Sequence, residues 1–593
     1  MTIELSDEQK EIFNKSGKFV VKACAGSGKT FTLSKKLVYL INKNPNKGIA
    51  ILSFTNNAWK EIKKNLDNWN VDIEYPNFIG TFDKFINKYI FYQYYYLLEE
   101  FSEIDKRPTL VGDLGIPWKK GKYKRDLEGF FDVFSFDSEN NLIKTTKKGL
   151  GFEFKKYNKN GEINQFYKKL KKTKYNYFRQ GFVTQADINY FSFKLIKKHK
   201  FISNIIANKF PIFLIDETQD TNEIKMKILK VIFNNPSVEE YMFVGDFNQA
   251  IYEWNGAKPE LFEQLMEKYE VKDLKENWRS SQQICDFASK LTKTEIKAVN
   301  EIYKDFQFAP KILGYEYKNK NEELKEVITK FLKICEEYDI KINQKDVAVL
   351  CKGNNLIKEL NGKKNFNFDE VFSKKSDITY ELIYSKFLFE NFEIKESYEK
   401  LEPILISLHN NKNTISNQER KEYIEIIGFF QMRDKCLELL KLMPSTKNIS
   451  LNDWIIQFRR KLKKSDYELK RQFLKKIKNV EVDIIIEDLF ESNIEKNKYL
   501  LSTIHKAKAK TFDAVLLILL TKGEKFGYEK LIKEFNDGEK MHEELKNVYV
   551  GITRPRKILL LAVPKTHEKI WFELFFNDPF IEDKNQSTLS CYF

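Results

Sequence analysis

A short glycine-containing segment near the start of the chain carries residues suited to binding phosphate. It reads Ala25-Gly26-Ser27-Gly28-Lys29-Thr30 and follows an apolar run. The glycines let the backbone curl so that successive N–H groups face a phosphate chain, while the lysine supplies positive charge and the threonine hydroxyl can ligate Mg²⁺. The first glycine of the strict pattern is Ala23 here, so the match is to its G-S-G-K-T core. The alternative is a glycine-rich turn with an incidental lysine, but the preceding strand pattern and the following helix pattern favour a nucleotide site.

A pair of adjacent carboxylates ends a later apolar run, Leu214-Ile215-Asp216-Glu217. At the end of a strand beside a bound nucleotide, Asp216 would hold Mg²⁺ and Glu217 would polarise the attacking water. Taken alone, such a pair could equally cap a helix and interact with its dipole. Together with the loop at Lys29, the pair predicts hydrolysis of a nucleoside triphosphate.

Short apolar runs that alternate with helix-like segments must position these residues. The sequence predicts a helix from Thr30 to Ile41 and strands at 19–23, 49–54, 212–215, 241–244, 347–351, 499–503, 514–519 and 558–562. Apolar strands that alternate with helices indicate doubly wound parallel sheets, with ligands at the carboxyl ends of the strands. The predicted fold class is therefore α/β, with two such sheets.

Two segments of different character interrupt the strand pattern. Residues 92–195 are rich in lysine and aromatic residues, and alternation around Asn160-Gly161 predicts a hairpin at 152–167. Residues 361–497 have a mostly helical and basic pattern. The predicted order is a first core domain at 1–91 and 196–275 with an insert at 92–195, a second core domain at 276–360 and 498–570 with an insert at 361–497, and a tail at 571–593.

Composition limits the class of protein. A chain of 593 residues should form about three to five domains. The net charge of +16 suggests a polyanionic partner, although lysine enrichment from an AT-rich genome would also raise it. The six cysteines are scattered without a C-x-x-C pair, which argues against an iron–sulfur cluster, a zinc module or a disulfide framework. Without a signal-peptide pattern or an apolar run of about 18 residues, we expect an intracellular, soluble protein, cytoplasmic or nuclear according to the host.

The carboxylate pair continues as Asp216-Glu217-Thr218-Gln219-Asp220-Thr221-Asn222, which resembles the D-E-x-Q-D-T-N block of the UvrD/Rep/PcrA superfamily 1 helicases. Further blocks resemble the family's motifs in the same order, at Leu5 to Gln9, Ser53 to Asn56, Gly80 to Phe82, Val244 to Ala257, Asn277 to Ser280, Ser502 to Lys508 and Tyr549 to Arg554. The resemblance spans residues 5 to 562 and is poorest in the two inserts. It implies two RecA-like core domains, each with an inserted subdomain, the first mixed α/β and the second mostly helical.

The resemblance implies a role for each matched residue at the nucleotide, with ATP as substrate and Mg²⁺ as cofactor. Gln9 would read the adenine edge, and Trp278 would stack on the base. Gln249 would sense the γ-phosphate and its attacking water. Arg279 and Arg554 belong to the second core domain, so they would reach the γ-phosphate only when the two cores close over ATP, which would couple hydrolysis to domain motion.

A second set of matched residues is expected along single-stranded DNA, which is held by cationic grooves and stacking aromatics. The resemblance places Phe54, Tyr252 and Trp254 on this track, with Thr81 and His505 nearby. Aromatic residues at strand ends are more often core packing, but the short spacing from Gln249 to Tyr252 and Trp254 favours the track. Basic clusters within the inserts either contact duplex phosphates or form solvated faces, and they lie at Lys119 to Arg125, Lys168 to Lys172 and Arg459 to Lys464.

The block after His505 departs from the family pattern at two positions. Ala509 stands where the family usually has glycine, and Thr511 stands where it usually has glutamate. The first change, from glycine to alanine, leaves less space for the backbone to approach phosphate or DNA. The second removes an expected hydrogen-bond acceptor for the nucleotide sugar. Hydrolysis is still expected, because the residues assigned to catalysis are all present.

The last residues, Gln586 to Phe593, resemble the peptide by which proteins dock on PCNA-type sliding clamps. Leu589, Tyr592 and Phe593 would form one apolar plug, with Gln586 in a polar pocket. The alternative is a tail that packs on its own domain.

The function expected overall is an ATP-dependent 3′→5′ DNA helicase or translocase of repair, replication or recombination. The alternative is an ATP-hydrolysing DNA sensor or recruitment subunit, in a repair or anti-phage complex, with little unwinding of its own.

Overall fold

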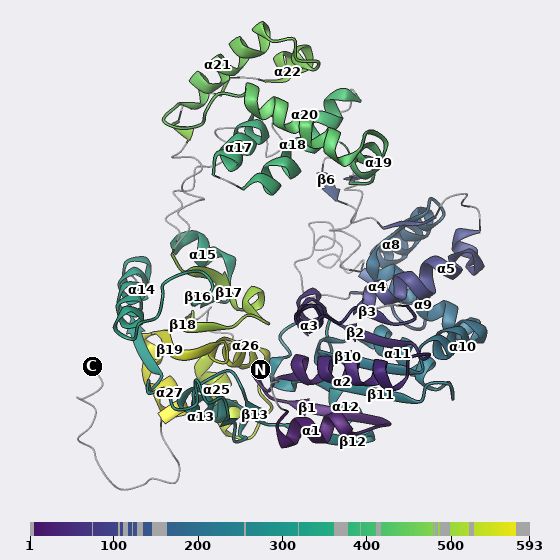
Figure 1. Cartoon of the computed structure of the whole chain (residues 1–593), viewed down its shortest axis with the longest axis vertical. Coiled ribbons are helices and arrows are strands. Elements are labelled where there is room, and N and C mark those ends of the chain that lie inside the picture. The colour runs from purple at the N-terminus through teal and green to yellow at the C-terminus, as the bar shows by residue number, and fades with distance from the viewer. Residues whose placement is uncertain are drawn as a thin grey trace. The chain divides into compact units, whose positions relative to one another are not determined.

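The chain forms two compact units (Figure 1), which are described separately. Unit 1 comprises residues 1–108, 130–357 and 497–593, and unit 2 comprises residues 109–129 and 358–496. The structure is a computed structural model and describes residues 5–73, 75–102, 104, 107–110, 117–120, 123–126, 134–144, 163–253, 256–317, 320–360, 378–391, 393–410, 415, 417–477, 479–480, 484–486, 498–520 and 527–576.

The first large sheet of unit 1 has six strands, all parallel, in the order β12-β1-β11-β10-β2-β3. Their bounds are β1 (Lys18–Ala23), β2 (Ile49–Ser53), β3 (Phe78–Thr81), β10 (Ile212–Asp216), β11 (Glu240–Gly245) and β12 (Glu270–Leu274). Parallel order brings all the carboxyl ends to one edge of the sheet, so the segments that follow β1, β10 and β11 meet there.

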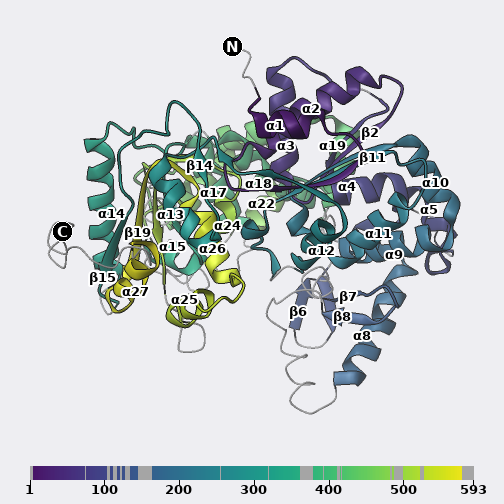
Figure 2. The same cartoon turned by 90° about the horizontal axis from the view of Figure 1, so that it is seen from below.

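Helices cover both faces of this sheet (Figure 2). On one face, Leu214 packs in a cluster with residues of α1 (Asp7–Asn14), α2 (Lys29–Lys43) and α3 (Asn56–Asn68). On the other, Phe213 contacts Phe233 of α11 (Glu223–Phe233), their ring centroids 5.0 Å apart. Because successive strand residues point to opposite faces, a strand covered on both sides needs an unbroken apolar run. Most positions of the central strands are apolar, which is why the sequence predicted these strands.

The second large sheet of unit 1 has five parallel strands in the order β15-β19-β18-β16-β17. Their bounds are β15 (Lys311–Tyr315), β16 (Val347–Cys351), β17 (Leu500–Thr503), β18 (Phe512–Ile518) and β19 (Pro555–Pro564). The accompanying helices are α13 (Gln282–Thr292), α14 (Lys320–Glu337), α24 (Ile504–Ala507), α25 (Tyr528–Asn536), α26 (Glu543–Ile552) and α27 (Lys565–Phe576). The predicted fold class, α/β with two doubly wound parallel sheets, is confirmed.

Three strands of the two large sheets were not predicted, namely β3, β12 and β15, and each lies at the edge of its sheet. β12 reads Glu-Val-Lys-Asp-Leu, and only its last residue is buried. An edge strand is partly exposed to solvent, so it need not be apolar and leaves a weaker pattern in the sequence.

The first insert contributes to unit 1 a small antiparallel pair, β7 (Phe134–Phe136) and β8 (Leu142–Lys144), and the helix α8 (Ile163–Phe178). The helix α9 (Gln185–Lys198) begins in this insert, and α10 (Lys200–Lys209) follows it. The predicted hairpin at 152–167 is wrong in its second arm, because residues 163–167 begin α8. Ile163, Phe166, Tyr167 and Leu170 have the spacing of one helix face, which outweighed the local alternation. The Asn160-Gly161 turn itself lies outside the described residues.

Unit 2 is mostly helical in its described part, as expected for the second insert. It contains α17 (Ile378–Glu390), α18 (Ile394–His409), α19 (Asn417–Ile427), α20 (Phe429–Leu442), α21 (Leu451–Lys464) and α22 (Lys470–Lys476) around a core that includes Trp454 and Phe458. β5 (Pro117–Lys120) and β6 (Tyr123–Asp126) pair in antiparallel fashion. Across the described residues of both units, no helix has the length and apolar character needed to cross a membrane.

Candidate active site

The phosphate-binding loop connects β1 to α2. Gly26 and Gly28 both adopt a φ of +76°, in the left-handed region that glycine tolerates best. A Cβ on Gly26 would lie 2.7 Å from the side-chain amide nitrogen of Asn277, so this glycine also permits close contact with the second half of unit 1. Lys29 is the first residue of α2 and is nearly buried. The loop thus has the backbone geometry that the sequence indicated.

A cavity of about 280 Å³ lies against this loop and is lined by residues of both large sheets and their loops. This volume is close to the range of small-ligand sites, about 300–1,000 Å³. The lining includes predicted site residues from the loop at Gly26 to Thr30, and also Glu217, Gln249, Trp278, Arg279 and Arg554. The two parts of unit 1 therefore share one polar site.

Asp216 and Glu217 follow β10 at the edge of this site. Asp216 is fully buried, and its Oδ1 accepts the Glu217 N–H at 2.9 Å, while its Oδ2 has no hydrogen-bond partner among the residues that the structure describes. Burial, aided by Glu217, raises the pKa of Asp216 to about 7. A buried carboxylate oxygen without a partner is costly unless a cation binds it, so this site fits Mg²⁺.

Glu217 has a φ of +54°, which is strained for a non-glycine residue and is often found at functional sites. Its side chain accepts a hydrogen bond from the Gln219 amide. Burial acts to raise the pKa of Glu217, but the positive charges of Lys29 and Lys508 outweigh it, so the pKa is lowered. Glu217 is therefore held as a carboxylate, the form that can accept a proton from water.

A chain of polar contacts links the two sheets around Gln249. Gln249 Nε2 donates to Asp246 Oδ2 at 2.6 Å, and Arg554 Nη2 donates to Gln249 Oε1 at 3.2 Å. Arg279 Nη1 donates to the Thr553 carbonyl at 2.9 Å. Burial, together with the neighbouring Arg279, lowers the pKa of Arg554 to about 9. Two neighbouring guanidinium groups, one of them buried, are stabilised by an anion, and a γ-phosphate is such an anion.

Gln9 and Trp278 flank the loop near Gly28. A Cβ on Gly28 would lie 2.8 Å from Gln9 Nε2 and 3.8 Å from Trp278 Cδ1. Gln9 Oε1 accepts the Ser6 backbone N–H at 3.2 Å in a capping box at the start of α1, and the backbone N–H of Trp278 donates to the Gly26 carbonyl at 2.8 Å. The structure thus brings together the residues assigned to the base and those assigned to phosphate.

Several residues that line the cavity were not assigned a site role from the sequence. They are Phe31, Glu61, Tyr303, Lys508 and Arg556. Phe31 directly follows Thr30, and Lys508 lies in a matched block, so their positions in the sequence could have drawn attention to them. Glu61, Tyr303 and Arg556 gave no comparable signal, because only the packing of separate segments brings them to the cavity.

The residues predicted to contact DNA fall at two places. In the first sheet, Phe54 follows β2 and stacks on Phe82 with ring centroids 5.4 Å apart, while Thr81 ends β3 and accepts the Lys84 N–H at 3.2 Å. The ring centroids of Tyr252 and His505 lie 5.9 Å apart, and His505 Nε2 is 3.2 Å from the Ile251 carbonyl oxygen. Trp254 lies outside the described residues, as does the tail at 586–593. The DNA-contact roles remain predictions.

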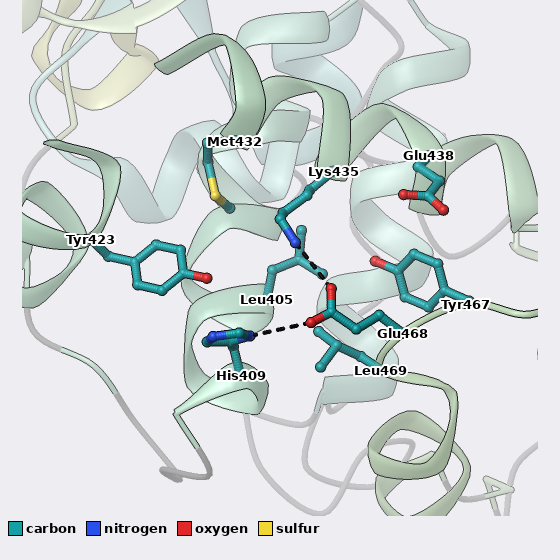
Figure 3. A pocket seen from close by; sticks show the side chains of 9 residues that line it. All are labelled: Leu405, His409, Tyr423, Met432, Lys435, Glu438, Tyr467, Glu468 and Leu469. Carbon is teal, nitrogen blue, oxygen red and sulfur yellow. Dashed lines mark hydrogen bonds and ion pairs between the residues drawn. The ribbon is translucent and has the colours of Figure 1, made fainter. Parts of the chain in front are cut away.

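Unit 2 has a separate small hollow between its helices (Figure 3). His409 and Lys435 both point toward Glu468, with the Lys435 nitrogen 3.0 Å and the His409 Nδ1 3.8 Å from its carboxylate oxygens. The hollow has a volume of about 20 Å³, which suffices for one water molecule. None of the predicted site residues lines it, so the cavity in unit 1 remains the candidate active site.

Comparisons with known proteins agree with this geometry. Residues 5–270 match the family model of the UvrD/REP helicase N-terminal domain, and residues 445–566 match that of the UvrD-like helicase C-terminal domain. The chain is 25% identical to the ATP-dependent DNA helicase Rep of Buchnera aphidicola, over 93% of this chain and 92% of that protein. It is 23% identical to a probable DNA helicase II homolog of Mycoplasma capricolum, over 95% and 84% of the two chains. It is also 24% identical to the Gabija protein GajB of Bacillus cereus, over 86% and 88%.

Proposed function

This chain belongs to the UvrD/Rep helicase family, and on that basis we propose that it is an ATP-dependent DNA helicase that moves along single-stranded DNA in the 3′→5′ direction. The observation that carries the proposal is the cavity in unit 1. It combines a phosphate-binding loop and Glu217 from one half of unit 1 with the half-buried Arg279 and the buried Arg554 from the other. The division into two core domains and two inserts, at the residue ranges predicted from the sequence, is part of the proposal.

Each residue at the phosphate end has a chemical role in hydrolysis. The loop N–H groups and Lys29 bind the β- and γ-phosphates. Thr30 and Asp216 would hold Mg²⁺, which when bound neutralises phosphate charge. The described residues contain no group of three His, Cys, Asp or Glu side chains that could hold a metal alone. Two protein ligands supplemented by phosphate oxygens are the usual arrangement for Mg²⁺.

Glu217 orients the attacking water and accepts its proton as the water oxygen bonds to the γ-phosphorus. The bond between that phosphorus and the bridging oxygen breaks, and ADP leaves. Arg279 and Arg554 stabilise the charge of the transferring group, a contribution worth about 10³–10⁵ in rate where it has been measured. Because both arginines come from the half of unit 1 that contains the second sheet, their contact with the γ-phosphate couples hydrolysis to the packing of the two halves.

Gln249 is the proposed link to DNA. Its amide contacts Asp246 and Arg554, and Tyr252 follows it by three residues. A change at the γ-phosphate that moves Gln249 therefore reaches the segment that would stack on bases. The alternative function is an ATP-hydrolysing DNA sensor or recruitment subunit with little unwinding. It is favoured by Ala509 and Thr511, which line the cavity and differ from the residues usual in the family.

A strand-displacement assay on duplexes with 3′ or 5′ single-stranded tails tests the proposal. The wild-type chain should unwind the 3′-tailed duplex with ATP and Mg²⁺ and leave the 5′-tailed duplex intact. Lys29→Ala should abolish hydrolysis. Glu217→Gln should bind ATP and DNA normally but hydrolyse at least a hundredfold more slowly, since general-base catalysis contributes about 10²–10⁴. Robust DNA-stimulated hydrolysis without displacement of either substrate would favour the sensor instead. Hydrolysis by Glu217→Gln within a few-fold of wild type would remove Glu217 from its role.

A further inference from the structure

Ala25, at the start of the phosphate-binding loop, is held at both of its backbone polar groups by side chains from the other half of unit 1. Its carbonyl accepts a hydrogen bond from the Asn277 amide at 2.7 Å, and its N–H donates to the Tyr549 hydroxyl at 3.3 Å. All three residues are buried. Leaving a buried backbone group without its partner is costly, so both contacts should persist while the loop binds phosphate.

The side chain of Asn277 also fixes the segment that carries Arg279. Its Oδ1 accepts the backbone N–H of Arg279 at 2.7 Å and that of Ser280 at 2.8 Å. An amide group offers one acceptor oxygen and one donor nitrogen, and here the oxygen faces two N–H groups while the nitrogen faces the Ala25 carbonyl. A single side chain thus joins the phosphate-binding loop to the turn that presents Arg279.

Hydrogen bonds around Thr553 connect the same contacts to Arg554. Arg279 Nη1 donates to the Thr553 carbonyl at 2.9 Å. The Thr553 hydroxyl donates to the Tyr549 carbonyl at 2.8 Å and accepts from Arg554 Nη2 at 3.1 Å. The two contacts made by the Ala25 backbone therefore lead through Asn277 to Arg279 and through Tyr549 to Arg554.

We propose that Asn277 and Tyr549 are positioning residues, which align Arg279 and Arg554 with the phosphate-binding loop through the backbone of Ala25. The inference rests on the proposed ATP hydrolysis and names residues that set its rate without touching the nucleotide. Neither side chain lines the cavity, so their loss should slow the chemical step and leave nucleotide affinity little changed.

The test compares the rate of hydrolysis at saturating ATP with the equilibrium affinity for ATP, in the full-length chain with Mg²⁺ and single-stranded DNA. Asn277→Ser keeps a hydroxyl that can accept the N–H groups of the local turn but is too short to reach the Ala25 carbonyl. It should lower the rate by about 10- to 100-fold, since a misplacement of about 1 Å can cost about a hundredfold. ATP affinity should change little.

Tyr549→Phe is a second variant that removes only the hydroxyl which accepts the Ala25 N–H. It should lower the rate by about 2- to 10-fold, the equivalent of one ordinary hydrogen bond. Because the aromatic ring remains in the core, this variant decides the question if Asn277→Ser does not fold.

A double-mutant cycle separates positioning from packing. Asn277→Ser added to Arg279→Ala should cause little further loss of rate, because the guanidinium that Asn277 positions is already absent. Losses that multiply in the double variant would show that Asn277 acts independently of Arg279, which contradicts the inference.

Asn300→Ser is the matched control. The Asn300 amide donates to the Trp278 carbonyl at 2.7 Å, so it supports the same segment at a different point. This variant should leave the rate at saturating ATP unchanged.

An unchanged rate in Asn277→Ser or in Tyr549→Phe overturns the inference, even if the melting temperature falls, because the contact would then serve packing alone. Equal effects of Asn277→Ser and Asn300→Ser also overturn it, as does a loss of ATP affinity in place of rate. If the wild-type chain hydrolyses no ATP, the proposed function fails as well.

Discussion

Ala509 adopts a backbone conformation that favours glycine. Its φ is +70°, and the residue lines the active-site cavity. In this left-handed region the Cβ of an L-residue crowds the backbone, at a cost of about 1–2 kcal/mol. The sequence comparison had already marked this position as one where the family usually has glycine. Ala509 therefore adopts a backbone conformation that glycine would adopt with less strain.

Ala509→Gly should stabilise the protein. Relief of the left-handed strain exceeds the extra chain entropy that glycine has when unfolded, about 0.5–1 kcal/mol, so a net gain of about 0.5–1 kcal/mol is expected. Denaturant unfolding measures it directly. Ala207→Gly in α10 is the control, and it should lower stability, because glycine in a helix interior is unfavourable. A loss of stability in both variants would show that Ala509 is not strained.

At the scale of elements, Lys508 connects the two large sheets through a buried ion pair. It follows α24, and its Nζ lies 2.8 Å from Asp220 Oδ2 and 2.8 Å from the Gln249 carbonyl oxygen. Both side chains of the pair are almost fully buried. Removing one partner of such a pair leaves an uncompensated charge in a medium of low dielectric constant.

Lys508→Met should reduce the free energy of unfolding by about 3–5 kcal/mol at pH 8. The loss should be smaller at pH 5. Burial raises the pKa of Asp220 to about 6, although Lys508 opposes this, and without the cation the pKa rises further. Since a protonated Asp220 needs no positive partner, the penalty grows as the pH rises through that pKa. Urea unfolding at several pH values measures the effect.

Lys540→Met is the matched control for this pair. Lys540 also reaches across unit 1, where its Nζ lies 2.9 Å from Glu263 of α12 (Glu260–Lys268), but its side chain is 75% exposed. Exposed pairs contribute only about 0–1 kcal/mol, so this variant should be nearly as stable as wild type. A loss in Lys508→Met that does not vary with pH would mean that the charge of Asp220 is not the cause.

At the scale of the whole molecule, the net charge of +16 makes DNA binding dependent on salt. Lys168 and Lys172 on α8 are exposed residues of a cluster proposed to contact duplex phosphates. Neutralising both as Lys168→Gln/Lys172→Gln should reduce the slope of log K against log salt for a tailed duplex by about 1–2, since each contacted phosphate contributes about 0.9. The slope for single-stranded DNA should not change.

Lys325→Gln/Lys330→Gln on α14 removes the same charge from another exposed helix surface and serves as the control. It should alter neither slope. Fluorescence anisotropy between 50 and 200 mM salt is a suitable measurement, because phosphate contacts respond strongly over about this range. Equal effects of the two double variants would assign the α8 lysines to a general solvated surface.

The tail is proposed to bind a PCNA-type clamp through Gln586, Leu589, Tyr592 and Phe593. Tyr592→Ala/Phe593→Ala should weaken clamp binding at least tenfold, because a fully buried large side chain contributes about 1.5–3 kcal/mol and about 1.4 kcal/mol is a factor of ten. ATP hydrolysis should be unchanged. Calorimetry with the clamp measures the first expectation. Absence of clamp binding in both forms, with a lower melting temperature for the variant, would make the tail a packing element instead.

Elements that are specified locally could be recognised from the amino-acid sequence alone. The central strands β2, β10 and β11 are buried on both faces and are mostly apolar, and β1 is so at Phe19 to Val21, which made these strands recognisable. The loop at Gly26 to Lys29 was recognisable because phosphate binding requires particular residues at fixed spacing. The carboxylate pair after β10 was identified for the same reason. These features depend on residues that are close together in the chain, so a local sequence pattern reveals them.

Which distant residues share the cavity depends on the tertiary structure. Glu61 and Tyr303 come from different halves of unit 1, and no spacing in the sequence specifies that both line the cavity. The pairing of Lys508 with Asp220 likewise joins residues that are 288 positions apart. Such contacts depend on the summed packing of many side chains across both sheets. A local pattern can suggest that a residue is buried or charged, but its partners follow from the fold as a whole.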